Sequence, residues 1–187
     1  MTCDMDIQNI YNSIAKLSRE IVRECTARSV KISTAESCTG GMISGAVTSI
    51  SGSSAVIELG VCSYSNRIKH EILHVPAEVL KQFTEYSVEC AAEMAKGVME
   101  LSGADYGVST TGVAGPTGGS AEHPVGEVCI AVSGRNGCRS ERFLFAQGSA
   151  DRELIRALAA EKALSMLLCE IKKSSGVNIN GKLHRQA

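Results

Sequence analysis

The segment VKISTAESCTGG, residues 30–41, joins a β-type run to a glycine-containing turn and decides the fold class of this chain. Residues 30–35 have the length and composition of a short strand, and residues 39–50 have those of a helix opened by two glycines. A strand that leads directly into a helix is the building unit of α/β folds. The segment therefore predicts a layered α/β domain.

The same alternation continues on both sides of this segment. Upstream, apolar residues recur at steps of three and four over residues 6–25, which is typical of an amphipathic helix. Downstream, Ser87 and Gly103 have the residue types expected at the start and the end of a helix. Further strands are expected over residues 57–64 and 106–111, short helices over residues 66–73 and from Pro76, a hairpin of residues 125–133 and 139–145 around an Asn-Gly turn, and a last helix over residues 149–171.

Alternating helices and strands followed by one antiparallel hairpin predict a three-layer α/β/α sandwich with a mixed, mostly parallel sheet. No internal repeat or linker divides the chain, so we expect a single domain over residues 1–172. Residues 173–187 are polar and contain Gly, Ser and Asn, which predicts a disordered tail.

The composition narrows the class of partner. The chain has 187 residues, a formal net charge of -1, 4% aromatic residues and no Trp. Balanced charge disfavours a duplex-binding surface, and scarce aromatic residues disfavour a stacking platform for single strands. No stretch resembles a signal peptide or a membrane span. We therefore expect a cytoplasmic protein without nucleic-acid or membrane partners.

The cysteines and histidines do not form a metal-binding pattern. The eight cysteines contain no CxxC and no paired ligand spacing, and most lie in apolar segments, so we expect reduced thiols. The four histidines also lack ligand spacing. We expect neither a metal nor a cofactor.

Ser37 and Cys38 follow the first expected strand and precede the two glycines. Unpaired N–H groups at the start of a helix can stabilise a developing oxyanion or bind a phosphate, so Ser37 is a candidate nucleophile. An N-cap role for Ser37 or Thr39 is the simpler interpretation. Cys38 competes as nucleophile because a helix N-terminus lowers the pKa of a thiol. Adjacent side chains at a turn diverge, so we expect only one of Ser37 and Cys38 to face the site.

A second strand-to-helix junction carries Tyr64 and Lys69. A lysine whose pKa is lowered by burial can take the proton of a serine hydroxyl, and a tyrosine can relay that proton or orient the pair. The alternative for Lys69 is a solvated position on the helix.

Residues 110–119 form a glycine-rich segment that could bring backbone close to a ligand or be only a loop. Thr111 supplies a hydroxyl there. Arg152, at the start of the last expected helix, could bind a phosphate or form an ordinary surface ion pair.

In this order, the motifs resemble the carboxyl-terminal domain of the CinA family, the nicotinamide-nucleotide amidohydrolases. The similarity runs over about residues 34–168. The residues that carry it are AESCTGG at 35–41, GSS at 52–54, YSN at 64–66 with Lys69, GAD at 103–105, TGVAGP at 111–116, PVG at 124–126 and Asp151-Arg152.

The resemblance implies hydrolysis of the carboxamide of nicotinamide mononucleotide (NMN) to nicotinate mononucleotide and ammonia, with an α/β/α fold and self-association into a homo-oligomer. It implies Ser37 as the nucleophile and Lys69 and Tyr64 as its activating partners. Thr111 and Arg152 match two further functional positions of the family, which we assign to substrate binding or site support. From the two glycine-containing turns themselves, we also expect Thr39, Gly40, Gly41 and Gly112 to contact the substrate.

The chain departs from the family pattern at three places. His123 stands where the family commonly has Lys, and residues 83–86 replace a smaller stretch. Ser149 and Ala150 separate Gly148 from Asp151, which affects the placement of Arg152. Two other functions remain open: a nucleotide-binding module without chemistry, and an interaction subunit derived from a larger CinA protein. Neither requires a nucleophile with a candidate base.

Overall fold

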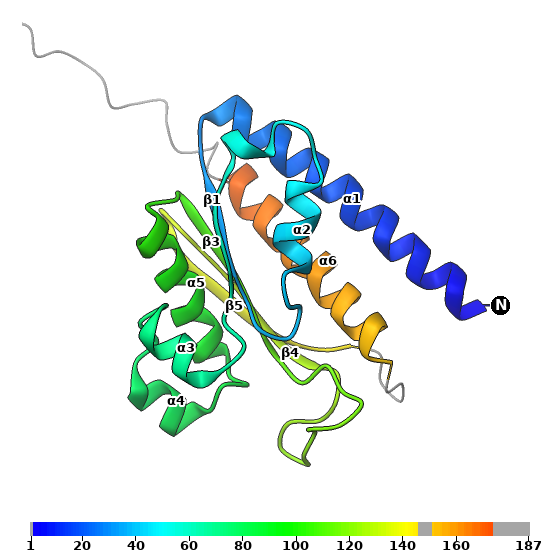
Figure 1. Ribbon diagram of the computed structural model, residues 1–187, viewed down its shortest axis with the longest axis vertical. Coiled ribbons are helices and arrows are strands. Elements are labelled where there is room, and N and C mark those ends of the chain that lie inside the picture. The colour runs from blue at the N-terminus through cyan, green and yellow to red at the C-terminus, as the bar shows by residue number, and fades with distance from the viewer. Residues whose placement is uncertain (1, 146–150, 174–187) are drawn as a thin grey trace, which may run out of the picture.

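The computed structural model describes residues 2–145 and 151–173, with side chains from residue 7 onward (Figure 1). The elements are α1 (Thr2–Arg28), β1 (Ile32–Glu36), α2 (Met42–Thr48), a 3-10 turn (Ser53–Ala55), β2 (Ile57–Cys62), α3 (Asn66–Glu71), α4 (Ala77–Phe83), α5 (Val88–Ser102), β3 (Tyr106–Gly112), β4 (Glu127–Gly134), β5 (Gly137–Leu144) and α6 (Arg152–Lys173).

The five strands form one mixed sheet in the order β2-β1-β3-β4-β5. Strands β2, β1 and β3 are parallel, whereas β4 is antiparallel to both β3 and β5. Only β4 is therefore reversed, and the hairpin turns between Gly134 and Gly137 as predicted. The carboxyl ends of β1, β2 and β3 meet at one edge of the sheet, where ligand sites of open α/β sheets lie.

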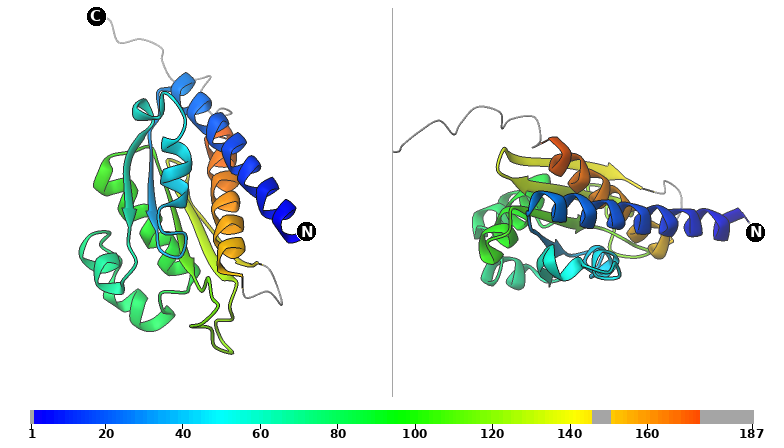
Figure 2. Two further views of the ribbon diagram at one scale, coloured as in Figure 1. Left: turned by 45° about the vertical axis from the view of Figure 1, so that its right-hand side comes forward. Right: turned by 90° about the horizontal axis from the view of Figure 1, so that it is seen from above.

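Helices cover both faces of the sheet. Figure 1 shows α1, α2 and α6 on one side and α3, α4 and α5 on the other. The larger apolar core lies under α1, α2 and α6, and the two long helices pack side by side (Figure 2). A second core joins α5 to β1 through Ala35, Met94 and Val98. The predicted α/β/α sandwich is confirmed.

The alternation of side chains along β1 decides what its carboxyl end presents to each layer. Successive side chains of a strand point to opposite faces. Ile32 packs in the α1–α6 core, whereas Ala35 packs against α5. Continued past the strand, the alternation places Glu36 on the α2 side and Ser37 on the α3 side.

Boundaries differ from the predicted ones at several ends. Helix α2 begins at Met42 rather than at residue 39. Helix α5 is bounded as predicted, because the Ser87 hydroxyl accepts the Cys90 N–H and Gly103 has φ 69°. The expected start of the last helix at residue 149, the insertion after Gly148 and all but the first residue of the expected tail lie outside the described residues.

None of the helices in the described ranges is both long and apolar enough to cross a membrane.

Candidate functional site

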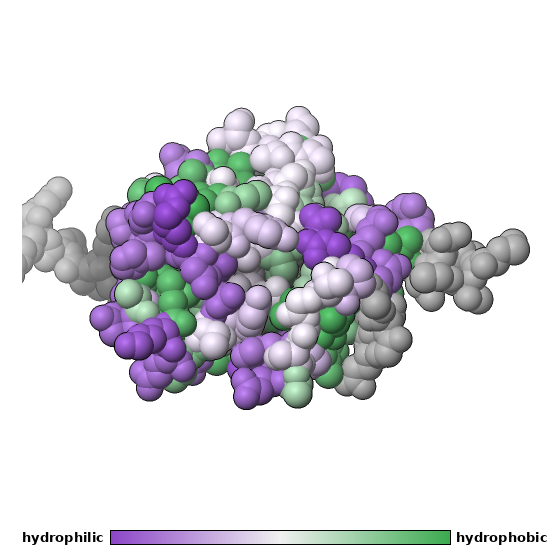
Figure 3. Space-filling view, turned by 60° about the horizontal axis from the view of Figure 1, so that its bottom comes forward, coloured by the Kyte–Doolittle hydropathy of each residue, from purple (hydrophilic) through white to green (hydrophobic). Residues whose placement is uncertain are grey.

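A cavity of about 310 Å³ opens where β1 and β3 end. Figure 3 looks onto this end of the molecule, where pale residues of intermediate hydropathy gather at the centre of the face. The volume lies at the lower end of the range found for small-molecule pockets. The lining residues are Ser37, Cys38, Tyr64, Ser65, Asn66, Lys69, Glu85, Tyr86, Gly112, Ala114 and Arg152.

Ser37 and Lys69 meet at the floor of this cavity. Lys69 Nζ donates a hydrogen bond to Ser37 Oγ at 3.2 Å, and the two residues are 1% and 8% exposed, respectively. Burial lowers the pKa of Lys69, and this effect outweighs the opposite influence of Cys90, Glu85 and Cys38. A lysine with a lowered pKa more readily provides a neutral amine that can accept the serine proton.

Cys38 also borders the cavity, but its side chain is buried in the core under α1, α2 and α6, whereas the Ser37 hydroxyl meets Lys69 of α3. Burial raises the pKa of the Cys38 thiol to about 12, although backbone N–H groups and Lys69 partly oppose this. The expected lowering by a helix N-terminus does not occur, because α2 begins four residues later. Cys38 therefore lacks the thiolate that nucleophilic attack requires.

The N-terminus of α2 is occupied by the carboxylate of Glu36. This fully buried side chain accepts the N–H groups of Gly41, Ile43 and Ser44 at 2.9–3.1 Å and the Ser44 hydroxyl at 2.8 Å. The N-cap position is Gly41, so the expected capping by Ser37 or Thr39 was wrong. These N–H groups are already bonded and do not face a ligand, which corrects the expectation of a free helix N-terminus.

The turn between β1 and α2 supports the site from behind. Thr39 is fully buried, where its hydroxyl donates to Glu36 Oε2 at 2.7 Å and shares a hydrogen bond with the Thr110 hydroxyl. Arg156 holds the same turn by donating to the carbonyls of Cys38 and Thr39. Thr39, Gly40 and Gly41 do not line the cavity. We replace their expected substrate contacts with a supporting role.

Thr111 and Gly112 both lie at the end of β3, but only Gly112 lines the cavity. The Thr111 hydroxyl donates to the Glu85 carbonyl at 2.6 Å and does not line the cavity. Gly112 does line it, and a Cβ at this position would lie 2.2 Å from the Glu127 carbonyl oxygen. Glycine is therefore required for the close approach of β3 and β4 beside the cavity.

Tyr64 and Arg152 form the mouth of the cavity. Arg152 donates to the Tyr64 hydroxyl at 3.0 Å and to the Gly115 carbonyl at 2.7 Å. Tyr64 is 65% exposed. Among the described residues, no hydrogen bond joins Tyr64 to Ser37 or Lys69. The structure thus brings Lys69, but not the tyrosine hydroxyl, into direct contact with Ser37.

The sequence reasoning did not assign roles to Glu36, Asn66, Glu85 or Arg156. Asn66 and Glu85 line the cavity and are hydrogen-bonded to each other at 3.1 Å. The spacing of Arg156 from Arg152 was an available signal, because residues four apart share one face of a helix. Within residues 7–145 and 151–173, no group of three or more His, Cys, Asp or Glu side chains is placed to hold a metal.

A model of the CinA C-terminal domain matches residues 14–171. The chain belongs to this family. It is 45% identical over 161 residues to the nicotinamide-nucleotide amidohydrolase PncC of Enterobacter agglomerans, covering 85% of this chain and 96% of that protein. It is also 46% identical over 140 residues to a CinA-like protein of Geotalea daltonii, of which it spans only 33%.

Solved structures of the CinA superfamily share the fold. The competence/damage inducible protein CihA from Agrobacterium tumefaciens is 42% identical with a TM-score of 0.81, over 84% of this chain and 94% of that one. A CinA superfamily protein from Klebsiella pneumoniae is 32% identical with a TM-score of 0.80, over 86% and 98%. The match therefore covers nearly the full length of both solved chains. In contrast, it covers only about a third of the length of several longer CinA-like relatives.

Proposed function

We propose that this chain hydrolyses the carboxamide of NMN to nicotinate mononucleotide and ammonia. The observation that carries the proposal is the similarity to an amidohydrolase of nicotinamide nucleotides over nearly that protein's whole length. The buried contact between Ser37 and Lys69 supports it, because amide hydrolysis by a serine requires an adjacent group that removes the hydroxyl proton.

In the proposed first step, the Ser37 oxygen attacks the amide carbon while the neutral Lys69 amine accepts its proton. The amide carbonyl becomes a tetrahedral oxyanion. The Ser37 N–H is bonded to the Thr110 carbonyl and the Gly41 N–H to Glu36, and Thr39 and Gly40 do not line the cavity, so we assign the oxyanion to the N–H group of Cys38. One such donor contributes about 3–4 kcal/mol in other hydrolases.

In the second step, the carbon–nitrogen bond breaks and Lys69 returns its proton to the departing ammonia. Water then attacks the Ser37 ester, Lys69 again carries the proton, and the carboxylic acid product leaves. Lys69 and water carry every proton in this scheme, so it requires no metal or cofactor.

Arg152 is the residue that we assign to the 5′-phosphate of the substrate. It lies at the cavity mouth, where its guanidinium is oriented by Tyr64 and by the Gly115 carbonyl. An arginine that is fixed in this way is suited to bind phosphate oxygens. Tyr64 then acts as an orienting residue at the mouth rather than as a proton relay.

The test is incubation of the purified chain with NMN, with ammonia and nicotinate mononucleotide measured together. The proposal predicts equal amounts of the two products. Tight NMN binding without either product would favour the alternative of a binding module, and neither binding nor turnover would contradict NMN as the substrate.

A further inference from the structure

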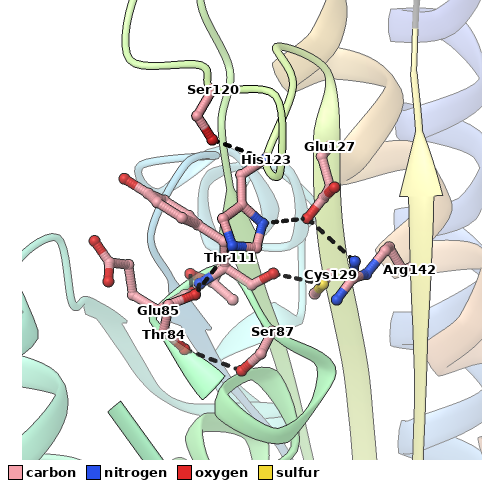
Figure 4. Close-up of polar contacts among 10 residues, drawn as sticks. Thr84, Glu85, Ser87, Thr111, Ser120, His123, Glu127, Cys129 and Arg142 are labelled. Carbon is pink, nitrogen blue, oxygen red and sulfur yellow. Dashed lines mark hydrogen bonds and ion pairs between the residues drawn. The ribbon is translucent and has the colours of Figure 1, made fainter. Parts of the chain in front are cut away.

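Glu85 and Tyr86 form one side of the cavity, which we call the acidic wall. Their backbone is held from behind by neighbouring strands, as Figure 4 shows. Thr111 donates to the Glu85 carbonyl at 2.6 Å, and the Cys129 thiol donates to the Tyr86 carbonyl at 3.3 Å. The His123 ring lies 5.3 Å from the Tyr86 ring. These contacts fix the wall before any ligand arrives.

His123 is held in place by contacts of both ring nitrogens and of its backbone N–H. Its Nδ1 lies 2.9 Å from Glu127 Oε1, and its backbone N–H donates to the Ser120 hydroxyl at 3.0 Å. Its Nε2 lies 3.4 Å from the Thr84 hydroxyl, next to the acidic wall. In Figure 4 the Glu85 carboxylate extends away from this network. These contacts therefore hold the backbone of the acidic wall, and the Glu85 carboxylate remains available to a ligand in the cavity.

The Glu85 carboxylate is a fixed negative charge. Asn66 donates to its Oε2 at 3.1 Å. Partial burial raises the pKa of Glu85, but hydrogen bonds from its backbone, Asn66 and Tyr86, together with the charge of Lys69, hold the pKa below its ordinary value. Glu85 is thus ionised at neutral pH. When Lys69 is the neutral amine that the proposed mechanism requires, Arg152 is the remaining cation among the residues that line the cavity, and its hydrogen bonds go to Tyr64 and the Gly115 carbonyl rather than to Glu85.

A carboxylate that lines a cavity together with two tyrosines favours a cationic aromatic group. Tyr64 and Tyr86 both line the cavity, and a tyrosine face attracts a cation. An anionic group in the same place would be repelled. An anionic group such as a phosphate is instead attracted by Arg152 at the mouth of the cavity. The cavity thus has a negative side at Glu85 and a positive side at Arg152.

Resting on the function proposed above, we propose that Glu85 is the specificity-determining residue that selects a positively charged pyridinium amide over a neutral one. In NMN the ring nitrogen is alkylated by ribose and carries this charge. The carboxylate formed by hydrolysis then lies in a cavity that contains Glu85, and repulsion between the two favours release of the product.

The test compares binding of NMN with binding of its reduced form, whose dihydropyridine ring is neutral while ribose, phosphate and carboxamide are kept. Calorimetry on a Ser37→Ala background measures binding without turnover. Adding Glu85→Gln should weaken NMN binding about tenfold or more and change binding of the reduced form less than about twofold. Glu85→Asp should keep most of the preference.

Glu89→Gln is the matched control, because Glu89 is an exposed carboxylate on α5 outside the cavity lining. It changes the net charge equally and should affect neither ligand. Equal weakening of both ligands by Glu85→Gln, or no weakening of either, would overturn the inference.

The two proposals fail separately in this design. If the wild-type chain releases ammonia from NMN but Glu85→Gln leaves the preference unchanged, only the role of Glu85 is wrong. If NMN binds with the predicted dependence on Glu85 but is not hydrolysed, only the proposed reaction is wrong. If NMN does not bind, both are wrong.

Discussion

Lys69 Nζ lies 3.2 Å from Ser37 Oγ, and each residue is less than a tenth exposed. Lysines are rarely buried without an acidic partner. Within the described part of the chain, no carboxylate forms an ion pair with Lys69. Burying this amine lowers its pKa and stabilises its neutral form. The arrangement is unfavourable for a structural lysine and suits a general base.

Replacing Lys69 with methionine should lower kcat for NMN by about 10²- to 10⁴-fold, because the Ser37 proton loses its acceptor. The fold should persist, since methionine fills a similar volume and removes a buried amine that has no acidic partner among the described residues. Steady-state ammonia release and thermal unfolding check both points. Lys81→Met, at an exposed position of α4, is the control and should keep full activity. Near-normal kinetics for Lys69→Met would refute its role as base.

The lowered pKa of Lys69 also predicts how stability changes with pH. Between the pKa of Lys69 in the folded chain and its ordinary value of 10.5, the unfolded chain binds more protons than the folded one. The free energy of unfolding contributed by this group therefore rises with pH through that window. Urea denaturation of wild type and Lys69→Met at several alkaline pH values should show the rise only in the wild type. Parallel pH dependence of the two proteins would show that the pKa is not lowered.

Glu36→Gln should lower the free energy of unfolding by about 2–4 kcal/mol. The amide nitrogen would replace one acceptor oxygen and face N–H or hydroxyl donors at the start of α2. Glu100→Gln, at an exposed site on α5, should change stability by less than about 0.5 kcal/mol. Urea denaturation measures both. Similar stability of the two variants would mean that the Glu36 network is not needed.

Arg152→Gln should raise the KM for NMN about tenfold and leave that for nicotinamide riboside, which lacks the phosphate, nearly unchanged. Arg156→Gln provides the contrast, because Arg156 holds the turn that carries Ser37 and should affect both substrates alike. Steady-state kinetics with the two substrates separate these effects. An equal effect of Arg152→Gln on both substrates would exclude it from phosphate binding.

Local patterns in the sequence were sufficient to predict the fold. The amphipathic period of the first helix, the Ser87 cap and the Asn-Gly hairpin each act over a few residues, and the structure contains all three. The placement of Ser37 and Lys69 at one sheet edge follows from the parallel strands that precede them. The start of α2 depends on hydrogen bonds to Glu36, so the helix begins at Met42 rather than at the predicted residue 39.

The role of Glu36 was missed because capping is usually local. Short side chains at the N-cap are the common pattern, so Ser37 and Thr39 were the natural candidates. Here the chain turns at Gly41, which has φ 94°. This turn brings the first N–H groups of α2 within hydrogen-bond distance of the Glu36 carboxylate on the preceding strand. Alternation along β1 could have separated Glu36 from Ser37, but it could not show what either side chain would meet.

The acidic wall could not be derived from periodicity. Glu85 and Tyr86 lie between α4 and α5, where Thr84 has φ 64° and no regular pattern applies. Their position depends on Thr111 and Cys129, which come from strands later in the chain. Only the assembled fold brings these residues together.

Ammonia release from NMN by the wild type, Ser37→Ala and Cys38→Ala is the most direct test of the central claim. The account predicts release by the wild type and by Cys38→Ala, and none above background by Ser37→Ala with its fold retained. Release by Ser37→Ala at the wild-type rate, or a loss confined to Cys38→Ala, would contradict Ser37 as the nucleophile.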